Sequence, residues 1–444
     1  MTENISEATT KDRVLERLST RRATIGVIGL GYVGLPLAFN ALRRGFTVVG
    51  FDIDPEKVVA LEGGRPYLPH IDHGPLAPAR ADGRFTPTSD YSLIAGCDAV
   101  LICVPTPLGP HREPDLSYVE STMAAALPHL QPGQILSLES STYPGTTEEL
   151  IGRPVASRGF TVGEDVFVVY SPEREDPGNA RYHSHTIPKV VGGMTPACSE
   201  VGQALYAHIV EQVVPVTSTR VAEMTKLLEN IYRAVNIGLV NELKLVAEGL
   251  GIDIWEVIDA AATKPFGYKP FYPGPGLGGH CIPIDPFYLT WKAKEVGINT
   301  RFIELAGEIN SAMPAHVVRK TVDELNRRGT AVPAARLLVL GASYKKNVGD
   351  LRESPALEIM EDLLSRGARV DYADPFIPHV PPTRRHDLSQ SAVELTPDVV
   401  SGYDGVVLAT DHDAFDYEML LAKARLIIDT RGRFRDGHSN VVSA

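Results

Sequence analysis

The sequence has few cysteines, no long apolar run and no excess of positive charge, and each absence excludes a class of protein. Its four cysteines form no CxxC pair and no spacing typical of a zinc site or a disulfide framework, so we expect no metal and a reducing, cytoplasmic location. No apolar run approaches the ~20 residues that cross a bilayer, and residues 1–20 lack the apolar stretch of a secretory signal. A formal net charge of -12 argues against a general basic surface for nucleic acid.

The length and composition are those of a globular protein with more than one domain. A prior of roughly 150 residues per domain predicts about three units. The hydrophobic fraction of 43% and the charged fraction of 22% are ordinary for a soluble chain without low-complexity tracts.

The first part of the chain has the pattern that opens a Rossmann unit. An apolar run at 23–28 leads into Gly29-Leu30-Gly31-Tyr32-Val33-Gly34, a helix is predicted at 35–44, and a second strand at 47–51 ends in Asp52. The order strand, glycine turn, helix, strand and acid is typical of a dinucleotide site. Further buried strands are predicted at 99–104, 135–138, 166–170 and 213–216.

The middle of the chain changes to helical spacing, and the last part returns to strands. A long helix is predicted at 223–250, followed by helices at 254–262 and 302–328, and their apolar surface favours a homodimer. The strand-then-glycine pattern restarts at 336–341. It is followed by a helix at 355–366 and strands at 369–372, 405–408 and 426–429.

These patterns predict an α/β fold of two Rossmann-like doubly wound lobes joined by a long central helix and a helical dimerisation region. The predicted domains are residues 1–217, 218–328 and 329–444. Doubly wound sheets bind ligands at the carboxyl ends of their strands, so we expect the site in a cleft between the lobes.

The glycine motif and Asp52 favour NAD as the cofactor. Gly29 permits the tight turn, Gly31 lets a pyrophosphate approach the backbone, and Gly34 lets helix and strand pack closely. Asp52 can accept hydrogen bonds from a ribose hydroxyl and would repel the 2′-phosphate of NADP. Glycine triplets also arise by chance, but the flanking strand, helix and acid argue against that here.

Cys281 is the candidate nucleophile, because a glycine- and proline-rich loop leads into it. The segment Gly274-Pro275-Gly276-Leu277-Gly278-Gly279-His280-Cys281 precedes Asp285-Pro286, which is a typical helix start. A thiol near a helix N-terminus ionises more readily. The alternative is a small buried hydrophobe, which is how we interpret Cys97, Cys103 and Cys198.

Polar residues elsewhere are candidates for the same site. Lys226 and Asn230 lie four residues apart on one face of the predicted long helix, where an ammonium and an amide could hold a developing oxyanion. A lysine on a helix is otherwise a solvated charge. The segments 139–147 and 171–178 follow strand ends, and from their residues alone either ligand binding or ordinary turn chemistry fits.

With these pieces in this order, the chain resembles the UDP-glucose/UDP-N-acetylhexosamine 6-dehydrogenase family over essentially its whole length after Ala23. The motifs that carry the resemblance are Gly29-x-Gly31-x-x-Gly34, Val104-Pro105-Thr106-Pro107, Glu139-Ser140-Ser141-Thr142, Ser171-Pro172-Glu173, Lys226-x-x-x-Asn230, Gly278-Gly279-His280-Cys281 with Asp285, and Ser343-Tyr344-Lys345-x-Asn347-x-x-Asp350-x-Arg352-x-Ser354.

The resemblance implies a four-electron oxidation at C6 of a nucleotide-linked hexose, with two NAD used in succession. Cys281 would add to the intermediate aldehyde, and the second oxidation would leave a thioester that water hydrolyses. Lys226 and Asn230 would stabilise the oxyanion, and Asp285 would help to activate water or orient Lys226. Thr142 and Glu173 would position water.

The site residues that follow from the motifs form three overlapping sets. The catalytic set is Cys281, Lys226, Asn230, Asp285, Glu173 and Thr142. The cofactor-binding set is Gly29, Gly31, Tyr32, Val33, Gly34, Asp52, Lys57, Pro105, Thr106 and Thr142. The substrate-binding set is Glu173, Arg174, Lys226, Asn230, Tyr268, Tyr272, Gly276, Lys345 and Arg352, in which the cationic side chains suit a diphosphate.

The sugar is indicated by two departures from the glucose branch of the family. That branch has Pro-Glu-Phe-Leu where this chain has Pro172-Glu173-Arg174-Glu175, and a serine before the cysteine where this chain has His280. The resemblance therefore favours UDP-N-acetylglucosamine or its manno epimer. UDP-glucose and dTDP-glucose stay open as substrates.

Two other functions compete with the two-step dehydrogenase. One is a two-electron alcohol dehydrogenase in which Cys281 is structural. The other is a regulator that binds NAD without turnover, which would leave Lys226, Asn230, Cys281 and Asp285 without a role.

Overall fold

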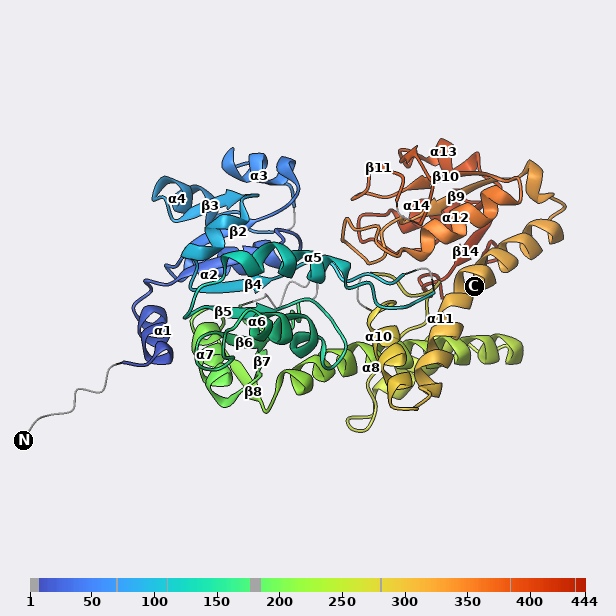
Figure 1. Ribbon diagram of the computed structural model, residues 1–444. Helices are drawn as coiled ribbons and strands as arrows, with labels where there is room; N and C mark the ends of the chain where they lie inside the picture. The colour runs from blue at the N-terminus through green and yellow to red at the C-terminus, as the bar shows by residue number, and fades with distance from the viewer. Residues whose placement is uncertain are drawn as a thin grey trace, which may run out of the picture. The chain divides into compact units, whose positions relative to one another are not determined.

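The structure is a computed structural model that describes residues 8–68, 71–109, 111–175, 185–279, 282–383, 385–435 and 437–444 (Figure 1). The chain divides into two compact units. The first consists of Met1–Glu229 and Trp291–Gly297, and the second of Asn230–Thr290 and Ile298–Ala444. The helix α8, Thr219–Leu250, begins in the first unit and ends in the second.

The first unit contains an eight-stranded sheet in the order β3-β2-β1-β4-β5-β6-β7-β8. All neighbouring strands are parallel except β6 and β7. The order of the first six strands is that of dinucleotide-binding Rossmann sheets. The strands are β1 Thr24–Ile28, β2 Thr47–Phe51, β3 Phe85–Thr88, β4 Ala99–Ile102, β5 Ile135–Leu138, β6 Phe167–Tyr170, β7 Lys189–Gly193 and β8 Val213–Val216.

Helices cover this sheet and close its core. The α-helices are α1 Thr10–Ser19, α2 Gly34–Arg43, α3 Pro55–Glu62, α4 Leu76–Ala81, α5 Ser117–Ala126, α6 Arg153–Ser157 and α7 Pro196–Ala207. Short helices of other types are η1 Tyr91–Gly96, η2 Leu127–His129 and η3 Glu148–Gly152.

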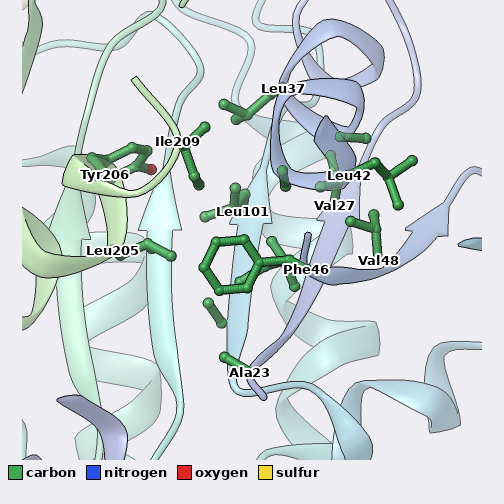
Figure 2. Packing of buried hydrophobic residues seen from close by; sticks show 14 of the residues in the cluster. Ala23, Val27, Leu37, Leu42, Phe46, Val48, Leu101, Leu205, Tyr206 and Ile209 are labelled. Atoms are coloured by element: carbon green, nitrogen blue, oxygen red, sulfur yellow. The ribbon is translucent and has the colours of Figure 1, made fainter. Parts of the chain in front are cut away.

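The core of the first unit explains why its central strands are almost entirely apolar. Every residue of β4, β5 and β6 is buried, as expected for a parallel sheet covered on both faces. Figure 2 shows one side of this core, where Leu37 and Leu42 of α2 and Leu205 of α7 pack with strand residues around the fully buried Phe46. Burying one such side chain stabilises the fold by about 1.5–3 kcal/mol.

The second unit contains a five-stranded sheet in the order β10-β9-β13-β14-β15, in which all neighbours are parallel. Numbered within this unit the order is 2-1-3-4-5, that of flavodoxin-like doubly wound sheets. The strands are β9 Arg336–Leu340, β10 Arg369–Ala373, β13 Gly405–Leu408, β14 Ile427–Asp429 and β15 Val441–Ser443, and β11 His379–Val380 pairs separately with β12 Gln390–Ser391.

Most of the remaining helices belong to the second unit. They are α9 Ile254–Ala262, α10 Asp285–Glu295, α11 Arg301–Arg327, the short η4 Val332–Ala334, α12 Pro355–Ser365, α13 Pro397–Ser401 and α14 Tyr417–Lys423. Of these, α10 continues from the second unit into the segment Trp291–Gly297 of the first. None of the helices in the described part of the chain combines the length and apolar character needed to cross a bilayer.

The predicted fold class is confirmed, with two Rossmann-like sheets and a long helix between their sequences. The division at residues 217 and 328 stays a prediction. The sequence analysis assigned no structure to the helix α1, which begins with a capping box formed by Thr9 and Asp12. It also did not find the strands β3, β7 and β15, which are short or contain charged and turn-forming residues.

Candidate active site

The glycine turn after β1 has the shape that a dinucleotide requires. Gly29 has a φ of +90°, and a Cβ there would lie 2.6 Å from the carbonyl oxygen of Cys103. A Cβ on Gly34 would lie 1.9 Å from the carbonyl oxygen of Gly29, whereas a Cβ on Gly31 would meet nothing within 4 Å. Gly29 and Gly34 are therefore required by the fold, and the open space lies beside Gly31.

The N-terminus of α2 adds donors to this open space. Val33 at the N-cap gives no side-chain cap to the helix, so backbone N–H groups of the first turn are left for other partners. Phosphate groups are stabilised at such a helix end by these donors and by the helix dipole. The residues around the turn thus fit the pyrophosphate of NAD.

Asp52 follows β2 and is almost completely buried, with 5% of the residue exposed. Its Oδ2 accepts a hydrogen bond of 2.9 Å from Leu30 N, and its Oδ1 accepts one of 3.0 Å from Asp54 N. The ammonium of Lys57 lies 3.1 and 3.3 Å from the two carboxylate oxygens. A ribose hydroxyl would therefore share or replace the contact with Lys57, whose side chain is 34% exposed.

Two other predicted residues lie at the ends of β4 and β5. Thr106 is 4% exposed, and Thr142 is completely buried. The Thr142 hydroxyl makes no hydrogen bond with the described residues. Because buried polar groups are nearly always paired, this hydroxyl calls for a ligand or a water molecule.

A buried carboxylate holds the segment after Thr142 in place. Glu223, on α8, accepts hydrogen bonds from Gly145 N at 2.6 Å and from the N–H and hydroxyl of Thr147 at 2.9 and 2.7 Å. Burial raises the pKa of Glu223 to about 7. The sequence analysis did not single out this residue, because a glutamate on a helix gives no sign of burial.

Glu173 and Arg174 follow β6 and are both held by neighbours. Glu173 Oε1 accepts hydrogen bonds from the N–H groups of Arg174 and Glu175 at 2.7 and 2.8 Å, and its side chain is 16% exposed. The Arg174 guanidinium forms an ion pair of 2.6 Å with Glu229 and donates a hydrogen bond of 2.6 Å to Pro188 O. Arg174 therefore fixes its own loop in this structure.

Lys226 and Asn230 both lie on α8, and both are buried. Lys226, in the first unit, is 8% exposed and forms no ion pair within the described part of the chain. Asn230, in the second unit, donates a hydrogen bond of 2.5 Å from Nδ2 to Asp285 Oδ2, at the first residue of α10. Asp285 is thus seen to orient Asn230.

Two of the motifs contact each other in the second unit. Gly279 N donates a hydrogen bond of 3.0 Å to Arg352 O. A Cβ on Gly278 would lie 2.4 Å from Tyr344 Cβ, and one on Gly279 would lie 2.9 Å from the Tyr344 ring. The glycines of the loop before Cys281 are therefore required because the loop from 343 to 354 packs directly against them.

The other predicted substrate residues belong to the second unit and differ in exposure. Tyr268 is 39% and Tyr272 46% exposed, and the Tyr272 hydroxyl donates a hydrogen bond of 2.6 Å to Asp259. Lys345 is half-buried. Arg352 forms a two-point ion pair with Asp350, with distances of 3.0 and 2.7 Å to Oδ2.

Cys281 and His280 lie outside the described residues. The other cysteines have surroundings that suit structural roles. Cys97 and Cys198 are buried, and burial raises the pKa of the Cys97 thiol to about 12. Burial also raises the pKa of Cys103 well above its ordinary value, so this thiol stays protonated and unreactive.

Comparison with known proteins matches three parts of the chain to one family. The NAD binding domain of the UDP-glucose/GDP-mannose dehydrogenase family matches residues 23–210, the central domain matches 220–312, and the UDP binding domain matches 338–436. The chain belongs to this family. Its cofactor is NAD, and it is an oxidoreductase acting on nucleotide sugars, as the sequence analysis predicted.

Individual relatives are similar over almost their whole length. A UDP-N-acetyl-D-glucosamine 6-dehydrogenase of Pseudomonas aeruginosa is 35% identical over 88% of this chain and 91% of its own. An NDP-N-acetyl-D-galactosaminuronic acid dehydrogenase of Ralstonia nicotianae is 37% identical over 92% of this chain and 96% of its own. The solved structure of a UDP-D-ManNAc dehydrogenase from Pyrococcus horikoshii is 31% identical, with a TM-score of 0.85 over 94% of this chain and 98% of its own.

Proposed function

We propose that this protein oxidises the C6 hydroxyl of a UDP-N-acetylhexosamine, UDP-N-acetylglucosamine or UDP-N-acetylmannosamine, to a carboxylate. The contact between Gly279 N and Arg352 O carries this proposal, because it joins the loop that leads to Cys281 to the loop that bears Lys345 and Arg352. The cationic side chains of Lys345 and Arg352 suit a diphosphate. The N-acetylhexosamine preference is supported by the names of the relatives and by Arg174, where the glucose branch has phenylalanine.

The residues of this chain have separate roles in the proposal. The turn from Gly29 to Gly34 and Asp52 would hold NAD, which would supply the hydride acceptor for each of the two oxidations. Cys281 adds to the aldehyde as a thiohemiacetal, the second oxidation removes a hydride from that carbon to leave a thioester, and water then releases the acid and the thiol. Lys226 and Asn230 stabilise the oxyanion, and Asp285 orients Asn230 through the hydrogen bond of 2.5 Å.

Water is positioned by two residues at the strand ends of the first unit. Thr142 is suited to this because its buried hydroxyl has no partner among the described residues. Glu173 is suited because one carboxylate oxygen is fixed by backbone N–H groups while the side chain keeps 16% of its surface exposed.

We also propose the domain division at 217 and 328 and a homodimer formed through the central helices. Large apolar side chains on α8 and α11 are exposed in the single chain, among them Leu228 at 60%, Leu239 at 51% and Phe302 at 81%. Large apolar side chains that a single chain leaves exposed favour an interaction site. Sedimentation of the purified protein tests the dimer, and a monomer at micromolar concentration would contradict it.

The central experiment follows NADH formation with UDP-GlcNAc, UDP-ManNAc, UDP-glucose and dTDP-glucose, with the product identified by mass. We expect about two NADH per sugar, a uronic acid product and no free aldehyde, because the thioester retains the intermediate. The Cys281→Ser enzyme should stop before the uronic acid is formed. A variant that turns over normally would favour the two-electron alcohol dehydrogenase, and a wild type inert towards all four sugars would favour the NAD-binding regulator.

A further inference from the structure

A charged cluster is buried beneath the strand ends of the first unit. Lys189, the first residue of β7, is 5% exposed, and Glu139, directly after β5, is 2% exposed. The Lys189 Nζ lies 2.7 Å from Glu139 Oε2. Both charged groups are thus removed from water, and the short contact is a charge-assisted hydrogen bond.

The same ammonium contacts the loop after β6. Lys189 Nζ lies 3.5 Å from Ser171 O, 3.3 Å from Pro172 O and 3.8 Å from Glu173 Oε2. One side chain therefore connects the ends of β5 and β6, the two strands from which the proposed water-positioning residues Thr142 and Glu173 follow.

The ion pair is itself anchored from the opposite side. The Tyr206 hydroxyl, from α7, donates its hydrogen bond to Glu139 Oε1, and its oxygen also lies 2.7 Å from Ser137 Oγ. The Tyr206 ring centre lies 5.2 Å from Lys189 Nζ, and Figure 2 shows Tyr206 beside Leu205 and Ile209 of the core. Burial opposes the charge of Lys189, but the neighbouring carboxylates outweigh it and raise the pKa of Lys189, so the ammonium stays charged.

Stability alone does not account for this arrangement. Burying two ions costs several kcal/mol for each, and a buried ion pair can be replaced by well-packed apolar residues with little loss of stability. An ammonium is useful here where a carboxylate has to be held. Glu139 and Glu173 both face Lys189 Nζ, at 2.7 and 3.8 Å, and of the two only Glu173 keeps part of its side chain exposed, so it is the one that can reach a ligand.

We propose that Lys189 is a positioning residue for Glu173 and that it serves the hydrolytic half of the reaction. This inference rests on the function proposed above. In that step a water oxygen forms a bond to the thioester carbon, the carbon–sulfur bond breaks and the Cys281 thiolate leaves. The water proton passes to the Glu173 carboxylate, no electrons are exchanged, and Lys189 neither gains nor loses a proton.

The test compares Lys189→Met with Lys189→Arg and with Lys11→Met in the full-length enzyme. Lys11 is a matched control, because its Nζ also lies 2.7 Å from a glutamate oxygen, that of Glu200, but on the surface. The measurements are the NADH formed in the first turnover, the steady-state kcat and KM, and the mass of the intact protein during turnover with the sugar that the wild type oxidises.

We expect Lys189→Met to keep a first-turnover burst of about two NADH per site while kcat falls by about 10–100-fold, since a misplaced base loses part of its general-base contribution. Because the slowed step follows formation of the covalent intermediate, KM should fall together with kcat, and a covalent sugar adduct should accumulate. Lys189→Arg should recover most of the rate, and Lys11→Met should match the wild type.

A double variant keeps the test decisive if Lys189→Met folds poorly. Lys189→Met/Glu139→Leu removes both buried charges, so it should restore the folded state while the adduct still accumulates. Recovery of wild-type kcat in this double variant would overturn the inference, because the lysine would then serve only to neutralise Glu139. Loss of the burst together with kcat in a folded Lys189→Met enzyme would overturn it as well. A wild type that forms one NADH per sugar, or none, would instead contradict the proposed function itself.

Discussion

Both parallel sheets end their first strand in a glycine turn, and the two turns can be compared atom by atom. Gly29 has a φ of +90° and Gly341 one of +82°. Their N–H groups donate to the carbonyl oxygens that end the neighbouring strands, Phe51 at 2.8 Å and Ala373 at 2.9 Å. A Cβ would lie 2.6 Å from Cys103 O at the first turn and 2.4 Å from Thr410 O at the second. The backbone constraint is the same in both units.

The acid that follows the second strand distinguishes the two turns. Asp52 accepts from two backbone N–H groups and from the half-exposed Lys57. Asp374 accepts from Ser343, from Phe376 and Ile377, and from Nε2 of His412, whose side chain is completely buried. His412 Nδ1 accepts from Asn347 N, so the proton lies on Nε2.

This difference shows that the topology provides the turn but not the ligand site. At Asp52 a flexible ammonium can give way to a ribose hydroxyl, whereas at Asp374 every partner is fixed by the fold. Among the described residues, Asp374 therefore lacks a flexible partner that a ribose hydroxyl could replace. The candidate ligand contacts of the second unit lie instead on the loop of Tyr344 and Arg352.

The largest effects are expected from alanine at the two turns. Gly29→Ala and Gly341→Ala should each lower the free energy of unfolding by about 2–4 kcal/mol, because a Cβ is strained at positive φ and overlaps a carbonyl oxygen. Urea unfolding measures this. Gly31→Ala is the control, since its Cβ meets no atom within 4 Å. Its free energy of unfolding should change by less than about 1 kcal/mol. A larger loss would show that other atoms fill the space beside Gly31.

The next variants separate the two acids by their effect on NAD binding. Asp374→Asn should lower the free energy of unfolding by about 2–4 kcal/mol, because the donors around the buried carboxylate lose an acceptor. It should leave NAD affinity unchanged. Asp52→Asn should weaken NAD binding by about tenfold or more, with less loss of stability. Titration with NAD and thermal unfolding measure both quantities. Equal effects of the two variants on NAD binding would refute the distinction.

The sequence could predict the turns because each has a local signature. A glycine after an apolar run and an acid after the next strand are visible in the order of residues at Gly29 and Asp52. The environment of the acid could not be predicted, since His412 lies far along the chain from Asp374. Lys189, Glu223 and Tyr206 escaped notice for the same reason, because only the fold places these polar groups in the interior.

The comparison extends to pH, because two buried carboxylates have opposite pKa shifts. Burial raises the pKa of Glu223 from 4.5 to about 7, so the stability it contributes is complete below pH 4.5 and is lost as pH rises through 7. Burial also acts against the charge of Asp374, but its hydrogen bonds, first that from His412, lower its pKa. Its contribution is present above its ordinary pKa of 3.8 and is lost as pH falls through the lowered value.

Thermal unfolding should therefore show that the free energy of unfolding falls by about 1–3 kcal/mol between pH 5 and 8.5. This fall should disappear in Glu223→Gln. The amide keeps an acceptor oxygen for Thr147, loses the one that Gly145 N uses, and does not ionise. Asp374→Asn should leave this slope between pH 5 and 7 intact and reduce only the loss of stability at acid pH. An unchanged slope in Glu223→Gln would show that another group titrates there.

The smallest effect is expected at Lys57, where it decides how the first acid receives its ligand. Lys57→Met removes the ammonium that lies 3.1 Å from Asp52 Oδ2, and a half-exposed pair of this kind is worth about 0–1 kcal/mol. If Lys57 only occupies the ribose position, NAD affinity should rise by up to about fivefold, because the carboxylate is released. If the lysine contacts the cofactor, affinity should fall instead. Isothermal titration with NAD distinguishes a rise in affinity from a fall. In an Asp52→Asn enzyme, Lys57→Met should leave NAD affinity unchanged, since without the carboxylate the ammonium has nothing to compete for.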